Sequence, residues 1–323
     1  MAELTRPGVA ADEPARPAVE APTRRLDVIG RRNIFFLISL VIIIPGIISM
    51  VMNGFQLGID FAGGNEFFLT FQNNPTQKQV EAAVASEGVT PLVQQSGQGS
   101  FIIKTPQLDP TKFQSDLTKK VGPIDGTKSS YQQVGATIAG ETVTAAALSI
   151  AVASGLILLY LAFRFRKVQG GWTAGFQFGG SALLALLHDV FLLCGIFSIL
   201  GTVFKLHIGE IDSLFLTAVL TVVGFSVHDT IVVFDRIREN MIVSSRLTFE
   251  QVVNLSIMQT AARSIITSFT VVLVLLSLLL FGGDTLKGFA LALLIGIVSG
   301  TYSSIFNATP LLVVWRRLQP VGR

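Results

Sequence analysis

Six long apolar stretches alternate with polar segments along the chain. Each is long enough for a helix to cross the hydrocarbon core of a bilayer, which takes roughly 20 residues. The stretches cover residues 34–52, 143–163, 172–200, 213–234, 264–281 and 288–315. The first is longer than the apolar region of a signal peptide and lacks a small-residue cleavage site, so we expect a retained helix, kinked at Pro45. The pattern predicts a polytopic α-helical membrane protein with six transmembrane helices.

Residues 54–140 interrupt the apolar pattern and predict a folded α/β domain between the first two spans. Strands are expected at 65–72, 91–95, 101–105 and 129–137, and helices at 76–88 and 109–122. The second helix has Asp109 as a capping residue and Pro110 at its first position, both typical of a helix start. The resulting β-α-β-β-α-β order is the ferredoxin-like plan.

Composition narrows the class of protein. Hydrophobic residues make up 50% of the chain and charged residues only 14%, against about 25% charged in ordinary globular domains. A net charge of +3 without a large basic patch argues against a nucleic-acid partner. The single cysteine, Cys194, excludes an intrachain disulfide. His188 has no second metal ligand in its pattern, so we expect no metal site.

The two ends of the chain are short polar segments. Residues 1–30 are rich in Ala, Pro, Glu and Arg and lack apolar periodicity, which predicts a disordered tail. We divide the rest into a first transmembrane helix at 31–53, the α/β domain at 54–140, transmembrane helices two to six at 141–317, and a tail at 318–323.

Basic residues predict the orientation, because cytoplasmic loops of membrane proteins are enriched in Lys and Arg. They gather in alternate segments, at Arg24, Arg25, Arg31 and Arg32, at Arg164, Arg166 and Lys167, at Arg236, Arg238 and Arg246, and at Arg316, Arg317 and Arg323. The short loops between these segments hold only Lys205 and Lys287. We therefore expect both termini in the cytoplasm and residues 54–140 in the periplasm.

Three ionisable residues inside the apolar stretches are candidates for function. Asp189 and Asp229 lie in the third and fourth stretches, and Arg263 lies at the start of the fifth. A charge at the centre of a membrane helix costs about 2.5–3.5 kcal/mol. Asp229 and Arg263 have compatible depths, which predicts a contact in which Asp229 binds and releases a proton with Arg263 as its partner. The alternatives are a static ion pair, or an Arg263 that reaches the headgroups. Asp189, next to His188, either extends the relay or forms structural hydrogen bonds.

Polar and small residues surround these candidates. Ser226, His228 and Thr230 lie beside Asp229 in the sequence and are expected to support it. In the last stretch, Gly296 and Gly300 alternate with Ser299 and Ser303, a spacing that favours close helix packing in lipid. Alternating charges at residues 235–240 predict (i, i+3) pairs that extend the fourth helix beyond the membrane.

Several of these segments resemble motifs of the SecF family of protein-export subunits. GIDFAGG at residues 58–64 is similar to the motif that follows the family's first helix, and LHDV at 187–190 to its third-helix motif. The segment GFSVHDTIVVFDRIREN at 224–240 resembles the specific fourth-helix signature, and RSIITS at 263–268 and FGG at 281–283 also match. The likeness extends over residues 31–317. His228 departs from the pattern, since many relatives have Asn there.

The resemblance implies a fold and a role. Such subunits form half of an RND-type transporter, with six helices and a periplasmic domain inserted after the first. They pair with SecD, act with the SecYEG channel, have YajC and YidC as further candidate partners, and use the proton-motive force to assist export of unfolded preproteins across the cell inner membrane. The resemblance implies no enzymatic activity and no cofactor besides protons.

The resemblance also assigns roles to individual residues. Asp229 and Arg263 occupy the family's proton-conducting positions. The four residues of the motif after the first helix that we single out are Gly58, Asp60, Gly63 and Gly64.

Three other functions remain open at this point. An RND-like exporter of small molecules or lipids would share the buried charges but needs a larger periplasmic region. An intramembrane hydrolase built on His188 and Asp189 would need a nucleophile or further ligands at the same depth. In a passive assembly factor the buried charges would be purely structural, and proton flux would separate it from a proton-driven subunit.

Overall fold

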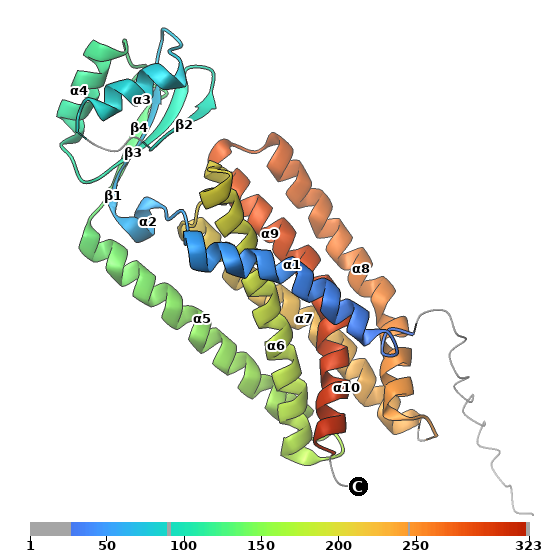
Figure 1. Cartoon of the computed structure of the whole chain (residues 1–323). Helices are drawn as coiled ribbons and strands as arrows, with labels where there is room; N and C mark the ends of the chain where they lie inside the picture. The colour runs from blue at the N-terminus through green and yellow to red at the C-terminus, as the bar shows by residue number, and fades with distance from the viewer. Residues whose placement is uncertain (1–26, 89–91, 245, 321–323) are drawn as a thin grey trace, which may run out of the picture.

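The computed structural model describes residues 27–320, apart from 89–91 and 245. Most of the predicted N-terminal tail therefore lies outside the described residues. Within them, six helical spans are long and apolar enough to cross a membrane, which confirms the predicted architecture (Figure 1). The spans are α1 (Arg32–Asn53), α5 (Ala136–Phe165), α6 (Gly171–Ser198) continued by the π-helical turn η1 (Ile199–Val203), α7 (Ser213–Val243), α8 (Phe249–Phe281), and α9 (Asp284–Ser303) continued by the π-helical turn η3 (Ser304–Ala308) and α10 (Thr309–Leu318).

Several helices are longer than their apolar stretches. α8 begins at Phe249, fifteen residues before the predicted start, because Thr248 and Gln251 form a reciprocal capping box there. α7 continues to Val243. Its polar end carries the expected (i, i+3) pairs Asp235–Arg238 and Arg236–Glu239, at 3.1 and 2.9 Å. Hydropathy therefore located the spans but missed helical turns whose side chains are polar.

The segment between α1 and α5 folds as an α/β domain with the predicted element order. It contains α2 (Ile59–Ala62), β1 (Gly64–Thr70), α3 (Gln77–Ala85), β2 (Leu92–Gly97), β3 (Ser100–Thr105), α4 (Pro110–Lys120) and β4 (Ser130–Val134). The strands form one antiparallel sheet in the order β2-β3-β1-β4. The predicted last strand was too long, since β4 ends at Val134 and α5 begins at Ala136.

The sheet buries one face against its two helices. Phe67, Leu69 and Ile103 alternate along β1 and β3 and are fully buried against α3 and α4, where Phe113 and Leu117 complete the core. The other face carries Glu66 and Lys104, which are directly opposite in the register. Figure 1 shows the domain at one end of the helical bundle.

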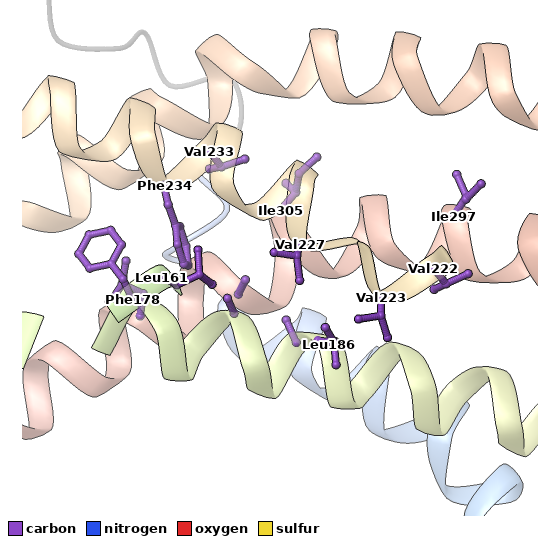
Figure 2. Packing of buried hydrophobic residues seen from close by; sticks show 14 of the residues in the cluster. Leu161, Phe178, Leu186, Val222, Val223, Val227, Val233, Phe234, Ile297 and Ile305 are labelled. Carbon is purple, nitrogen blue, oxygen red and sulfur yellow. The ribbon is translucent and has the colours of Figure 1, made fainter. Parts of the chain in front are cut away.

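The helical bundle has its densest packing around α6, α7 and α9. Figure 2 shows side chains from these helices meeting in one core, and Leu161 near the end of α5 joins Phe178 on α6 and Phe234 on α7 there. Val222 on α7 and Ile297 on α9 are buried in the same core. α1, α5 and α8 are mostly exposed along their lengths. The central helices therefore hold the polar residues away from lipid.

Candidate functional site

Asp189 lies at the centre of the bundle and is completely buried, with 0% of its surface exposed. Three serine hydroxyls donate hydrogen bonds to its carboxyl group. Ser226 on α7 and Ser303 on α9 bond to Oδ2 at 2.7 and 2.6 Å, and Ser299 on α9 bonds to Oδ1 at 2.6 Å. The carboxyl group therefore joins α6, α7 and α9 through hydrogen bonds that are strong when it is ionised.

His188 adds a fourth polar contact to this carboxyl group. Its Nδ1 atom lies 3.1 Å from Asp189 Oδ1, and its buried Nε2 atom has no hydrogen-bond partner among the described residues. The neighbours of the pair supply serine hydroxyls that bond to the carboxylate and not to the imidazole. Among the described residues, these hydroxyls serve as donors to the carboxylate, and none is hydrogen-bonded to the imidazole as a nucleophile is to its base.

Glycines on α9 create this close arrangement. A Cβ atom at Gly296 would lie 2.1 Å from Val222 Cγ2, and one at Gly300 would lie 3.0 Å from Ser226 Cβ. The absence of side chains lets α9 approach α7 closely enough for Ser303 to reach Asp189. The sequence signal was visible as small-residue spacing, but that spacing alone does not identify the serines as ligands of a carboxyl group.

Asp229 occupies a different environment, one turn further along α7 from Ser226. Its surface is 4% exposed, and Ser264 on α8 and Thr301 on α9 lie beside it. Its Oδ2 atom makes no hydrogen bond to any described residue. An unpaired buried carboxyl oxygen is unusual in folded proteins, and such groups are often functional. Asp229 therefore has an oxygen atom available to accept a proton.

The structure does not bring Arg263 to Asp229, so the predicted contact is absent from it. Ser264 faces Asp229, and Arg263 is exposed. Consecutive helical residues are about 100° apart around the axis, so only one of this pair can face the α7 contact. Arg263 therefore lies at nearly the depth of Asp229 but on another face of α8, one turn from the exposed Ile266.

The three residues that were predicted to support Asp229 have different roles in the structure. Ser226 binds Asp189, as described above. Thr230 is buried, and its Oγ1 atom lies 2.9 Å from Ser304 Oγ, so it joins α7 to the π-helical turn η3. His228 is exposed and does not share the buried side of α7 with these residues. Ser226, Asp229 and Thr230 thus share one stripe of α7 that links the two buried carboxyl groups.

The motif after α1 lies at the end of the bundle near the α/β domain. Asp60 Oδ2 accepts a hydrogen bond of 2.9 Å from the backbone N–H of Ser213, the first residue of α7. Gly64 has a φ of +114°, and a Cβ atom there would lie 2.5 Å from the carbonyl oxygen of Thr105. Gly63 also has a positive φ, of +72°. The two glycines therefore form the turn into β1, while Asp60 caps α7.

Family models match most of this chain. Residues 113–318 match the model described as protein export membrane protein SecD/SecF, C-terminal. Residues 48–74 match the SecD/SecF GG motif, which includes Gly63 and Gly64. The two matches together cover the motif, both carboxylates and all three serine ligands of Asp189.

Individual relatives give the same result. The chain is 45% identical over 307 residues to the protein translocase subunit SecF of Thermobaculum terrenum, covering 90% of this chain and 94% of that protein. It is 36% identical to the protein translocase subunit SecDF of Thermus thermophilus, covering 81% of this chain and 35% of that longer protein. A crystal structure of SecDF from the same genus and species, described as a translocon-associated membrane protein, superposes with a TM-score of 0.78 and 32% identity, over 91% of this chain and 39% of that one.

Proposed function

Because the chain belongs to the SecF family of protein translocase subunits, we propose that it works with SecD and uses protons to assist the export of unfolded preproteins. The observation that carries the proton-driven part is Asp229, a buried carboxyl group in the middle of the bundle with one unpaired oxygen. A passive scaffold has no need for such a group, which is costly to keep in a membrane.

The support for SecD as partner comes from the fused relative and from Arg263. In the longer SecDF protein the matched region is about a third of the chain, so a SecD-like part accompanies it. Arg263 is exposed in this single chain on the outer surface of α8, one turn from the exposed Ile266, where contact of its charge with lipid would be unfavourable. A second subunit that covers this face with an acidic or polar group removes that cost.

Proton binding at Asp229 has a direct consequence for helix packing. Protonation removes the charge and turns one carboxyl oxygen into a donor, which changes the polar contacts that it can make with the neighbouring Ser264 and Thr301. α7, α8 and α9 then favour a different relative position, to the extent that the proton binds the two arrangements with different affinity. One charge that crosses 100 mV supplies about 2.3 kcal/mol, enough to bias such an equilibrium.

The remaining parts of the proposal concern place and partners. The alternating basic segments support an inner-membrane orientation with both termini in the cytoplasm and the α/β domain in the periplasm. In that orientation the domain meets a preprotein leaving the SecYEG channel, with YajC and YidC as further candidate partners. Cysteines at the exposed Gln98 and Gln169, in a chain whose Cys194 is changed to Ser, should be labelled from opposite sides, and labelling from one side contradicts this orientation.

The proton-driven part is tested by Asp229→Asn in the complex with SecD, reconstituted in vesicles with a pH gradient. Asparagine keeps the size of a protonated aspartate but cannot ionise. We expect loss of proton flux and of gradient-dependent export, with normal insertion and SecD pairing. The matched control is Asp235→Asn on the same helix, where the exposed ion pairs with Arg164 and Arg238 contribute little. Unchanged proton flux in Asp229→Asn would favour the passive assembly factor.

A further inference from the structure

A buried ionic contact ties the α/β domain to the loop between α6 and α7. Lys104 on β3 forms an ion pair with Glu210 in that loop, and the two residues are only 9% and 7% exposed. Glu66 on β1 lies 3.8 Å from Lys104, and His207 Nδ1 lies 2.8 Å from Glu210 Oε2. None of these side chains belongs to the proton site in the bundle.

The loop that carries Glu210 leads directly into α7, which begins at Ser213. Asp212 accepts a hydrogen bond of 2.7 Å from the Phe215 N–H and caps the helix, while Asp60 accepts from the Ser213 N–H. Ile211 exchanges backbone hydrogen bonds with the linker after α1, donating to Gln56 at 2.9 Å and accepting from Gly58 at 2.8 Å. The beginning of α7 is therefore held from both sides, so a shift of α7 must move this loop.

The same helix carries the proton-binding carboxyl group. Asp229 follows Ser213 by 16 positions in one uninterrupted helix, which corresponds to about 24 Å at 1.5 Å per residue. A displacement of α7 along its axis therefore moves both the carboxyl group and the start of the helix. Movement at Asp229 thus reaches Glu210, and Glu210 contacts the sheet through its ion pair with Lys104.

The position of Lys104 explains why an ion pair is needed there. The chain connects the domain to the bundle at two places, through α2 into β1 and from β4 into α5. These connections lie on the β1–β4 side of the sheet, whose order is β2-β3-β1-β4, so the domain is free to turn about the line that joins them. Lys104 on β3, together with a 3.4 Å hydrogen bond from Gln94 on β2 to the Lys205 carbonyl, adds a contact on the other side of the sheet.

We propose that the Lys104–Glu210 pair is the coupling joint that makes the α/β domain follow α7 during the proton cycle. This inference rests on the proton-driven function proposed above. The pair stays closed throughout the cycle, because opening it would separate two largely buried opposite charges and leave Lys104 only with Glu66 and Glu210 only with His207, which is unfavourable. Lys104 acts as a positioning residue and takes no part in proton transfer.

The test uses Lys104→Met in the full chain reconstituted with SecD, and it measures proton flux and gradient-dependent export separately. We expect proton flux to remain while the stimulation of export by the gradient is lost. Lys112→Met, an exposed lysine on α4 of the same domain, is the matched control and should retain both. Lys104→Arg keeps the positive charge and should therefore keep the stimulation of export by the gradient, in contrast to Lys104→Met. Equal loss of proton flux and export in Lys104→Met, or retention of both, would contradict the proposed coupling role of the ion pair.

A second variant tests whether the pair stays closed. Lys104→Cys with Glu210→Cys, in a chain with Cys194→Ser, replaces the ion pair by a reducible thiol-specific crosslinker whose spacer makes up for the two long side chains. The crosslinked form should recover gradient-dependent export and the form released by reduction should not; an inactive crosslinked form would show that the contact must open. If wild-type complexes show no proton flux and Asp229→Asn changes nothing, it is the proposed function that fails, whatever the Lys104 variants do.

Discussion

Ser264, and not Arg263, faces Asp229 across the contact between α7 and α8. The carboxyl group therefore meets hydroxyl groups within its own subunit, while the guanidinium group is presented on the exterior of α8. The two residues still share a depth in the membrane, so a partner that covers α8 would complete a charged site that the single chain holds only in part.

Arg263→Met should reduce assembly with SecD without weakening the isolated subunit. Because Arg263 is exposed and forms no ion pair among the described residues, its loss should change the free energy of unfolding by less than about 0.5 kcal/mol. Thermal unfolding of the purified subunit in detergent checks the first part, and co-purification with SecD checks the second. A large loss of stability in the isolated subunit would mean that Arg263 pairs with a carboxylate of its own chain.

Asp189→Ala should destabilise the bundle. The substitution leaves Ser226, Ser299 and Ser303 without their buried acceptor, at a cost of about 1–3 kcal/mol for each group that stays unsatisfied. Asp189→Asn keeps an acceptor oxygen and should be markedly less destabilising. Thermal unfolding in detergent measures both variants. Equal stability of the alanine and asparagine variants would show that the three hydroxyls are satisfied in some other way.

Gly296→Leu should separate α7 from α9. The new side chain would collide with Val222, since even a Cβ atom would lie 2.1 Å from it, and overpacking of this kind costs about 1–3 kcal/mol. The matched control is Gly224→Leu on α7, because a Cβ atom there meets nothing within 4 Å. We expect a lower unfolding temperature for the first variant only, and a similar decrease in both would exclude a specific contact.

Stability should rise on mild acidification because of Glu66. Burial raises the pKa of Glu66 above 4.5, although the charge of Lys104 opposes this shift, and burial raises the pKa of Asp212 as well. A carboxyl group whose pKa is higher in the folded state adds stability as pH falls from neutrality toward its unfolded value near 4.5.

Glu210 acts in the opposite direction at lower pH. Burial alone would raise its pKa, but contact with His207 and the charge of Lys104 outweigh burial and hold the pKa below its usual range. Its contribution is therefore present above pH 4.5 and is lost as pH falls through the lower folded-state pKa.

The pH dependence can be measured by thermal unfolding of the full chain in detergent between pH 7 and 4.5. Glu66→Gln should flatten the rise in stability over this window, since glutamine does not titrate. Glu141→Gln, at an exposed position on α5, should leave the rise as in the wild type. A wild-type curve that falls steadily from pH 7 would contradict the part assigned to Glu66.

The sequence predicted the membrane architecture because lipid imposes a simple rule on composition and length. It also identified Asp189 and Asp229, since an ionisable residue inside an apolar stretch stands out on its own. The α/β element order was readable from caps such as Asp109 and Pro110, whose side chain and ring fix a helix start locally.

What the sequence could not supply was the rotation of each helix about its axis. The choice between Arg263 and Ser264 as the neighbour of Asp229 depends on that rotation, and the apolar residues surrounding both give no periodicity strong enough to set it. The serines that donate hydrogen bonds to Asp189 come from α7 and α9, while Asp189 lies on α6. Their identity therefore depends on how these three helices pack together, which no single segment reveals. Lys104 and Glu210 are 106 positions apart, and neither is unusual in its own segment.

Gly58 places an evolutionary constraint on the junction. A Cβ atom at this position would lie 2.7 Å from Glu210 Oε1, so any side chain there must displace the carboxylate that holds Lys104. Relatives that lose the glycine are therefore expected to have replaced the acid and the lysine as well. The residues at positions 58, 104 and 210, which are far apart in the sequence, should then vary together among relatives. A chimera that combines this linker with the α6–α7 loop of a relative in which they differ should lose the ion pair.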